Sequence, residues 1–316
     1  MSNDRHIPVL VDDVVDVLAP RDGAVYVDAT FGAGGYSRAL LEAADCTVWG
    51  IDRDPDTVAA SKEMSDHYGQ RLTVLTGRFG DMRELLSEVG VEQVDGIALD
   101  LGVSSMQIDD PARGFSFRAD GPLDMRMSRD GMSAADVVND LAEKELADII
   151  YKYGEERASR KIASAIVELR QISPIIRTSQ LADIVRKVVR KSKDGIDPAT
   201  RTFQALRIFV NEELAELDRG LAASLTLLGE GSRLAVVSFH SLEDRRVKTF
   251  FQERSGSAPK PSRHIPIVGE AADKYFDVIE RRGRIADDAE IRRNVRSRSA
   301  RLRWGVRTSA PTRTAA

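Results

Sequence analysis

The sequence predicts an α/β fold in which a doubly wound parallel sheet is interrupted by an inserted helical domain. In the first hundred residues, short apolar runs rich in β-formers alternate with runs of helical periodicity, as in βαβ units. From about residue 133 the periodicity is only helical, and strand-like runs then return. We therefore expect a first part of the sheet domain at 1–105, a helical domain at 106–200 and a second part of the sheet domain at 201–316.

The individual elements follow from composition and periodicity. Asp54-Pro55-Asp56 has the composition of a helix start, with proline in the first turn. The loop at 102–130 is too long for a simple connector, which favours a functional role. The expected strands lie at 25–29, 47–51, 72–75, 96–101, 233–239 and 300–306, and the expected helices at 37–44, 56–65, 82–89, 202–228 (ended by Gly229-Glu230-Gly231) and 242–253.

Composition excludes several classes of protein. No run of about 18 apolar residues is present, so we expect no membrane span, and the first residues lack an apolar secretion segment. Cys46 is the only cysteine, so no internal disulfide forms. The four histidines, His6, His67, His240 and His264, offer no metal-ligand spacing. These features predict a cytoplasmic protein without a metal.

The net charge of −4 conceals two basic segments. Residues 281–316 contain eleven arginines and three acidic residues, and residues 186–207 contain seven basic and two acidic residues. A polyanion responds to the local field of one surface more than to the total charge. The two segments are therefore either solvated surfaces or contacts for nucleic acid.

A glycine-rich turn, Gly32, Gly34 and Gly35, follows the first expected strand and precedes a helix. Such turns let a ligand approach backbone N–H groups. A dinucleotide-binding turn requires a third glycine where this chain has Ser37. A class I methyltransferase requires an acid four residues before the first glycine, and Asp28 stands there. A carboxylate suits the cationic amino-acid end of S-adenosylmethionine and repels a pyrophosphate, so the turn favours S-adenosylmethionine as the cofactor.

The ends of the second and third strands supply two further cofactor candidates. Asp52 can accept hydrogen bonds from both ribose hydroxyls, whereas the alternative role of helix cap suits Asp54 better. Phe79 lies where an apolar wall against adenine is needed, although an ordinary core position is the alternative. Asp81 is a second candidate for contact with the adenine amine.

Asp100 ends the fourth strand, at the position that faces the transferred methyl group in this fold. Enzymes that methylate an exocyclic amine often have Asp or Asn here, followed by Pro-Pro and an aromatic residue. This chain keeps only the acid, so the residue that stacks on a target base is not identified. We expect Asp100 to accept a hydrogen bond from the amine and to stabilise the cationic nitrogen that forms during transfer.

Other polar residues near the expected site have structural alternatives. His240 either contacts the substrate or hydrogen-bonds its own loop, and Ser241 with Asp244 resembles a capping box. Asp124 and Arg126 (with Arg129) lie in the loop after Asp100, where they either help to close a cleft or form an ordinary ion pair. We expect Met125 and Met127 to be packing residues.

Six blocks in one order resemble the bacterial 16S ribosomal RNA cytosine-N4 methyltransferase family, RsmH or MraW. With HIPVL at 6–10, the resemblance covers residues 6 to about 250, and the final arginine-rich stretch is also similar. The blocks are DLGVSS at 100–105, RGFSF at 113–117, DGPLDMRM at 120–127, YGEER at 153–157, TRTFQALR at 200–207 and SFHSLEDR at 238–245.

The resemblance implies a class I S-adenosylmethionine-dependent methyltransferase with a Rossmann-like doubly wound sheet. It implies methylation of N4 of a cytidine in the decoding region of 16S rRNA, within the small ribosomal subunit, and an inserted domain that helps to hold the RNA. Tyr36 and Gln107 enter as cofactor residues only through it, and some family members carry histidine in place of Tyr36. The implied cofactor positions are Gly34, Gly35, Tyr36, Asp52, Phe79, Asp100 and Gln107.

Two other functions fit the same cofactor site: methylation of another nucleic acid or of a protein, and binding of the cofactor only as a regulator. If the substrate is RNA, phosphate contacts help to offset the cost of unstacking the target base. Besides the arginine-rich tail, the candidate contacts are Arg186, Lys187, Arg190, Lys191, Lys193, Arg201 and Arg207.

Overall fold

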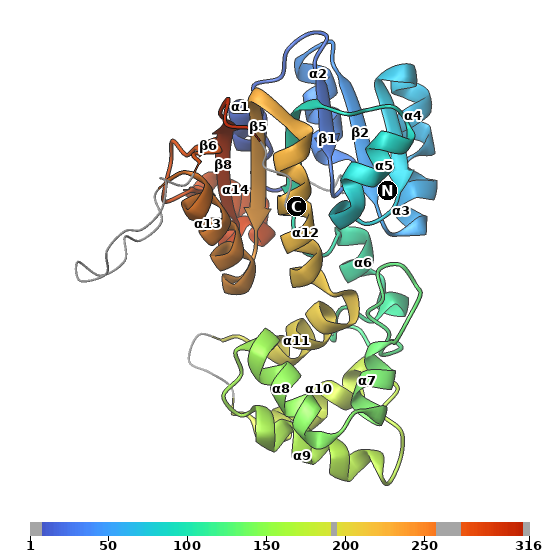
Figure 1. Ribbon diagram of the computed structural model, residues 1–316. Coiled ribbons are helices and arrows are strands. Elements are labelled where there is room, and N and C mark those ends of the chain that lie inside the picture. The colour runs from blue at the N-terminus through green and yellow to red at the C-terminus, as the bar shows by residue number, and fades with distance from the viewer. Residues whose placement is uncertain (1–7, 191–194, 257–272, 312–316) are drawn as a thin grey trace, which may run out of the picture. The chain divides into compact units, whose positions relative to one another are not determined.

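A computed structural model describes residues 8–190, 195–256 and 273–311 (Figure 1). The chain divides into two compact units. The sheet unit comprises Met1–Gly102 and Ala215–Ala316, and the helical unit comprises Val103–Leu214. Within the described ranges, no helix combines the length and apolar character needed to cross a membrane.

One mixed sheet forms the centre of the sheet unit, in the order β3-β2-β1-β4-β5-β8-β6, with β7 also paired to β8. The first five strands are parallel, and β8 is antiparallel to β5. The strand order reverses between β1 and β4, where a doubly wound sheet opens a ligand site at its carboxyl edge. The predicted fold class is confirmed. The strands are β1 Val25–Asp28, β2 Thr47–Asp52, β3 Leu72–Thr76, β4 Val94–Asp100, β5 Leu228–Ser238, β6 Phe276–Asp277, β7 Arg284–Ile285 and β8 Arg301–Arg307.

Both faces of this sheet are buried, because side chains alternate along each strand. In β4, Ile97 and Leu99 belong to one apolar cluster and Ala98 belongs to the cluster on the other face.

Asp54 caps α3 as predicted, since its side chain accepts a hydrogen bond from Asp56 N. The expected helix at 56–65 is two helices. The helices of the unit are α1 Val11–Leu18, α2 Gly35–Ala43, α3 Pro55–Ala60, α4 Lys62–Tyr68, α5 Met82–Glu88, α13 Ser241–Arg254 and α14 Asp288–Arg293, with short 3₁₀ turns η1 Gly69–Arg71, η2 Phe79–Asp81 and η4 Val295–Ser299.

The helical unit has its own apolar core. The loop after Asp100 contributes to it, because Met125 and Met127 are buried there as predicted. Asp124 and Arg126 form a two-point ion pair at 2.7 and 3.0 Å, which confirms the structural alternative for this pair. The helices are α6 Ser105–Asp109, α7 Ala134–Asp140, α8 Glu143–Gly154, α9 Ser159–Arg170, α10 Thr178–Val188 and α11 Ala199–Asn211, with the 3₁₀ turn η3 Pro111–Arg113; α12 Glu213–Leu227 continues into the sheet unit.

The prediction of one helix over 202–228 is wrong. Glu212 adopts a left-handed conformation (φ 55°) and separates α11 from α12. The side chain of Asn211 fixes this end, since it accepts from Met127 N and donates to Met125 O. The apolar stripe runs through the break, so periodicity alone does not reveal it. The predicted boundary at 200 also falls inside α11, and Gly229-Glu230-Gly231 lies in β5 instead of ending a helix.

A tight contact beneath the glycine-rich turn gives a test of the packing. A Cβ atom at Gly50 in β2 would lie 2.5 Å from the Phe31 ring. We expect Gly50→Ala to lower the free energy of unfolding by about 1–3 kcal/mol, the usual effect of overpacking. Urea denaturation measures the change. Gly229→Ala in β5 is the control, because its Cβ meets its nearest neighbour at 3.5 Å. Equal stability of the two variants would contradict the packing described for Phe31.

Candidate cofactor and active site

Asp28, the last residue of β1, is buried at the carboxyl edge of the sheet. Ser37 at the start of α2 donates two hydrogen bonds to its Oδ2, from the backbone N at 3.0 Å and from Oγ at 2.7 Å. Oδ1 is buried and has no hydrogen-bond partner in the described part of the chain. Burial raises the pKa of Asp28 to about 6, against the two hydrogen bonds from Ser37 and a weaker one from the Thr30 backbone. The serine that stands in place of a third glycine thus orients the acid through Oδ2.

The glycine-rich turn is held by Phe31, whose N donates to Ile51 O at 2.9 Å and whose carbonyl accepts from Gly34 N at 2.7 Å. Gly34 is left-handed (φ 71°), and a Cβ there would lie 2.7 Å from Phe31. A Cβ at Gly35 would lie 2.7 Å from Pro8. Neighbouring side chains therefore fill the space that a Cβ would need, so both positions require glycine.

Asp52, at the end of β2, fixes the other side of this turn. Its Oδ2 accepts from Gly32 N and its Oδ1 from Asp54 N, both at 2.8 Å. Burial raises the pKa of Asp52 to about 6. A carboxylate offers about four acceptor sites, so two remain for ribose hydroxyls. The bond to Gly32 was not predicted, and the ribose contact stays a prediction.

Phe79 begins η2 after β3 and is half-buried. Its ring packs on α12, where a Cβ at Gly220 would lie 2.6 Å from it. One part of the ring therefore belongs to the core, and the half-exposed part is left for the predicted contact with adenine. Asp81 is exposed, 3.7 Å from Arg219.

Asp100 lies at the end of β4, the strand next to β1. Its backbone N donates to Thr30 Oγ1 at 2.6 Å. Its Oδ1 is buried without a hydrogen-bond partner among the residues described. Burial raises the pKa of Asp100 well above its usual range, the charges of Asp28 and Glu243 raise it further, and a hydrogen bond with the Tyr36 side chain acts in the opposite direction. The sheet thus brings two carboxyl groups with uncommitted buried oxygens to one edge.

Tyr36 is buried beside this pair and holds the N-terminal segment. Its hydroxyl donates to Val9 O at 2.6 Å. Burial raises the pKa of Tyr36, followed by the negative charges of Asp100, Asp28 and Glu290. Glu290 in α14 accepts from Leu10 N at 2.7 Å. The sequence gives no signal for this last contact, because the two residues are 280 positions apart.

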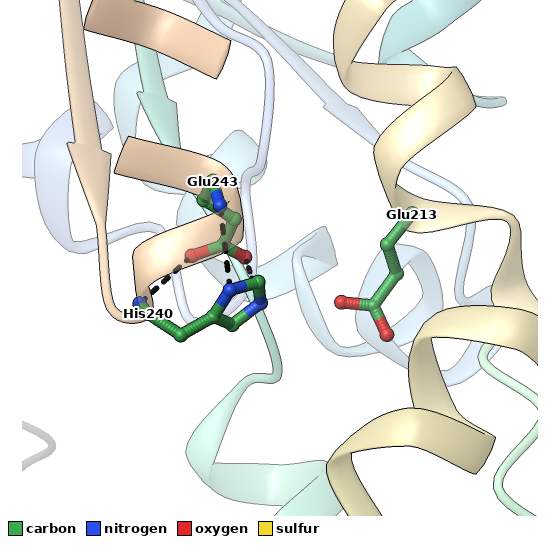
Figure 2. Close-up of side chains that lie close together, drawn as sticks. All are labelled: Glu213, His240 and Glu243. Carbon is green, nitrogen blue, oxygen red and sulfur yellow. Dashed lines mark hydrogen bonds and ion pairs between the residues drawn. The ribbon is translucent and has the colours of Figure 1, made fainter. Parts of the chain in front are cut away.

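The cap of α13 lies one residue earlier than predicted (Figure 2). His240 and Glu243 form the capping box, in place of Ser241 and Asp244: Glu243 N donates to His240 Nδ1, and Glu243 Oε2 accepts from the backbone N atoms of His240 and Phe239. Of the two roles predicted for His240, the structure therefore supports the hydrogen bond within its own loop. Asp244 instead accepts two hydrogen bonds from Arg303. Histidine is an unusual cap, which is why the more familiar serine pattern was misleading.

The remaining cofactor candidate, Gln107, belongs to the helical unit. Its side chain accepts from Ser104 N at 3.1 Å and its N donates to Ser104 Oγ, so it caps α6. Glu213, also drawn in Figure 2, belongs to the helical unit as well, where it pairs with Arg207 at 2.8 Å. The role of Gln107 toward a cofactor stays a prediction.

The basic candidates of the helical unit differ in their surroundings. Arg186 pairs with Asp183 and Asp197, and Arg207 pairs with a glutamate, so both already have carboxylate partners. Arg201 is exposed, near Glu155 O at 3.5 Å. Lys187 and Arg190 are exposed at the end of α10 and after it. Lys191 and Lys193 lie outside the described residues.

Comparison with known proteins identifies the family. The model of the MraW methylase family matches residues 3–308. The chain belongs to this family. Two relatives named "Ribosomal RNA small subunit methyltransferase H" are similar over almost the whole length. The protein from Rhodospirillum centenum is 63% identical over 308 residues, covering 98% of this chain and 94% of the relative. The protein from Paramagnetospirillum magneticum is 59% identical over 312 residues, covering 98% of each.

The family assignment makes this chain a methyltransferase with S-adenosylmethionine as its cofactor. The residues present fit that group. The buried, uncommitted oxygens of Asp28 and Asp100 suit a ligand that carries positive charge, and the turn at Gly34 and Gly35 leaves no room for side chains. A cation placed beside these carboxylates offsets the cost of burying them ionised.

The raised pKa values predict that cofactor affinity depends on pH. Asp28 and Asp52 each have a pKa of about 6, so both are ionised at pH 7 and mostly protonated at pH 5. Calorimetric titration with S-adenosylmethionine should show a Kd about tenfold weaker at pH 5 for each carboxylate involved. Asp28→Asn should weaken binding at pH 7 and reduce the pH effect, whereas Asp66→Asn, on the exposed surface of α4, should change neither.

Loss of stability at low pH does not account for the expected loss of cofactor affinity. For these two carboxyls the folded pKa lies above the ordinary value, so the ligand-free protein gains stability from them as the pH falls from about 6 towards 4. A wild-type Kd that is the same at pH 7 and pH 5 would rule out a charge interaction between these carboxylates and the cofactor.

Proposed function

We propose that this chain transfers a methyl group from S-adenosylmethionine to N4 of a cytidine in the decoding region of 16S rRNA. The proposal rests on Oδ1 of Asp100, which is buried and has no hydrogen-bond partner among the described residues. This atom lies where the strand order of the sheet reverses. The relatives named as small-subunit ribosomal RNA methyltransferases support the substrate class.

The cofactor, when bound, supplies a methyl group on a cationic sulfur. Asp28, with Ser37 fixing one of its oxygens, binds the ammonium end of the amino-acid portion. Asp52 binds the ribose hydroxyls while it holds Gly32 in place. Phe79 presents the half-exposed part of its ring to the adenine.

Asp100 positions the amine that is methylated. The lone pair of the cytosine amine is delocalised into the ring, so orientation matters more than a strong base, and orientation is worth roughly 7–11 kcal/mol in effective molarity. A cation bound nearby lowers the pKa of Asp100 back towards its ordinary range, which makes the group a hydrogen-bond acceptor. Its Oδ1 then accepts from the amine and stabilises the positive charge that develops on nitrogen. The methylated, cationic nitrogen then loses one proton to water, which gives neutral N4-methylcytidine, and no dedicated general base is required.

The target base must leave its stack, which costs a few kcal/mol. In this proposal the helical unit is the substrate-recognition domain, and Lys187 and Arg190 bind phosphates of the RNA, since both are exposed. The substrate is the RNA within the small ribosomal subunit, and the reaction takes place in the cytoplasm.

The acceptor and the role of Asp100 are tested together. Small subunits from cells that lack the enzyme are incubated with labelled S-adenosylmethionine, and N4-methylcytidine is identified after digestion. We expect Asp100→Asn and Asp100→Ala to lower kcat about 10²–10³-fold, as the loss of a transition-state contact does. Asp95→Asn, at the opposite end of the same strand, is the control.

Two results would count against this proposal. Unchanged turnover of Asp100→Ala, with folding and cofactor binding intact, would exclude the role of that carboxylate. Label on DNA or protein would exclude RNA as the acceptor, and no label on any polymer would favour a regulator that only binds the cofactor.

The RNA contact of the helical unit is tested by salt dependence. Each phosphate contact in a single strand contributes about −0.7 to the slope of log K against log salt. Lys187→Gln/Arg190→Gln should therefore make the slope shallower by about one to two. Lys144→Gln/Lys161→Gln removes two exposed charges from α8 and α9 of the same unit and should leave the slope unchanged. Identical slopes for both variants and the wild type would show that these residues do not touch RNA.

A further inference from the structure

Two sets of arginines in the C-terminal segment differ in how far their side chains are exposed. The inward set consists of Arg284, Arg301, Arg303 and Arg307. Arg284 pairs with Asp13, Asp16 and Glu280, and Arg303 pairs with Asp244. Arg301 also donates to Arg282 O at 2.6 Å, and Arg303 donates to Arg281 O at 3.0 Å. Arg307 donates to the carbonyls of Tyr275, Thr308 and Ala310. The inward set therefore fixes the backbone of the segment.

The second set is exposed and is concentrated on α14 and η4. Arg292, Arg293, Arg296 and Arg298 are exposed there, and we call them the α14–η4 surface. Val295, which is 72% exposed, lies among them. From residue 291 to the end, the sequence contains no acidic residue. Acidic residues of α14, Asp288 and Glu290, lie in its first turn, so the basic residues are concentrated at its C-terminal end and in η4. A local concentration of positive charge attracts polyanions.

The backbone beneath this surface is fixed by side-chain caps. Asp287 accepts from Glu290 N at 2.7 Å at the start of α14, and Asn294 accepts from Arg296 N at 3.1 Å at the start of η4. Ala300 N closes η4 on Ser297 O. Guanidinium groups on a fixed backbone lose less conformational freedom on binding than groups on a loose tail.

The surface lies at the edge of the sheet that carries the site. Arg301, directly after η4, pairs with Ser238 at the carboxyl end of β5. Glu290 of α14 binds Leu10 N, and the preceding Val9 carbonyl binds the Tyr36 hydroxyl, which adjoins Asp100. All of these contacts are within the sheet unit, so three side-chain contacts link α14 to Asp100, the group proposed to position the amine.

We propose that the α14–η4 surface is an RNA-binding surface of the sheet unit, which holds phosphates of the single strand flanking the target cytidine. This inference rests on the proposed function. Arginine forms planar two-point hydrogen bonds with phosphate, and an exposed apolar side chain among arginines suits a strand whose bases are unstacked. A polynucleotide is favoured over an acidic peptide as the ligand of this surface. In the proposed function an RNA strand must reach the site, and each nucleotide of that strand carries a phosphate charge.

The experiment compares two double variants of the full chain. Arg292→Gln/Arg293→Gln removes charge from the surface. Lys62→Gln/Arg83→Gln removes two exposed charges from α4, which contacts β3 at the opposite end of the strand order, and from α5. The probes are a transcript of the 16S decoding region for binding and small subunits from cells that lack the enzyme for turnover. Near physiological salt, we expect the surface variant to bind the transcript about tenfold more weakly, with a salt slope shallower by about one to two.

The kinetic readout separates binding from chemistry. The surface variant should show a higher KM for RNA, with kcat and the affinity for S-adenosylmethionine unchanged, and the control variant should match the wild type. A surface variant with wild-type RNA affinity and salt slope would overturn this inference alone. Absence of N4-methylcytidine with the wild-type protein would overturn the proposed function, and the binding comparison would still decide whether the surface holds RNA.

Discussion

The buried pair of Asp28 and Ser37 is the interaction on which the cofactor side of this protein depends. An ionised carboxylate in an apolar interior is costly unless hydrogen bonds or a counter-charge compensate it. Ser37 supplies two donors to one oxygen, and the other oxygen is buried without a hydrogen-bond partner among the described residues. The same contact joins the end of β1 to the start of α2 and so fixes the two ends of the turn between them.

The neighbouring strands complete this arrangement by packing. The Phe31 ring occupies the space that a side chain at Gly34 or Gly50 would need, and Asp52 binds the amide of Gly32. The conformation of the turn is therefore fixed by the packing of an aromatic ring and by a hydrogen bond to a carboxylate.

Sequence reasoning succeeded where the determinants are local. The predicted strands around Asp28, Asp52 and Asp100 end within one residue of the observed ends, and the proline start of α3 was predicted from a few neighbouring residues. The two-residue strands β6 and β7 and the helices α1 and α14 were not predicted. Sequence reasoning failed where contacts between segments distant in sequence determine the local structure. The break at Glu212 depends on bonds from Asn211 to a loop about 85 residues earlier, which no periodic pattern carries. The contact of Tyr36 with Val9 has the same cause. From composition alone, the C-terminal arginines appear as a single basic segment. Their burial in the structure divides them into a structural set and an exposed set.

The insertion of the helical unit also has a consequence for the order in which the protein is synthesised. The buried side chains of its core come from residues 115–206, a single uninterrupted stretch that the ribosome completes first. The sheet core needs residues from both sides of that stretch, and β4 meets its partner β5 only after residue 228 has emerged. Until then β4 has an unpaired edge, which is a template for incorrect pairing. All core residues of the helical unit are therefore synthesised before those of the sheet unit are complete, and the first hundred residues wait longest for their remaining partners.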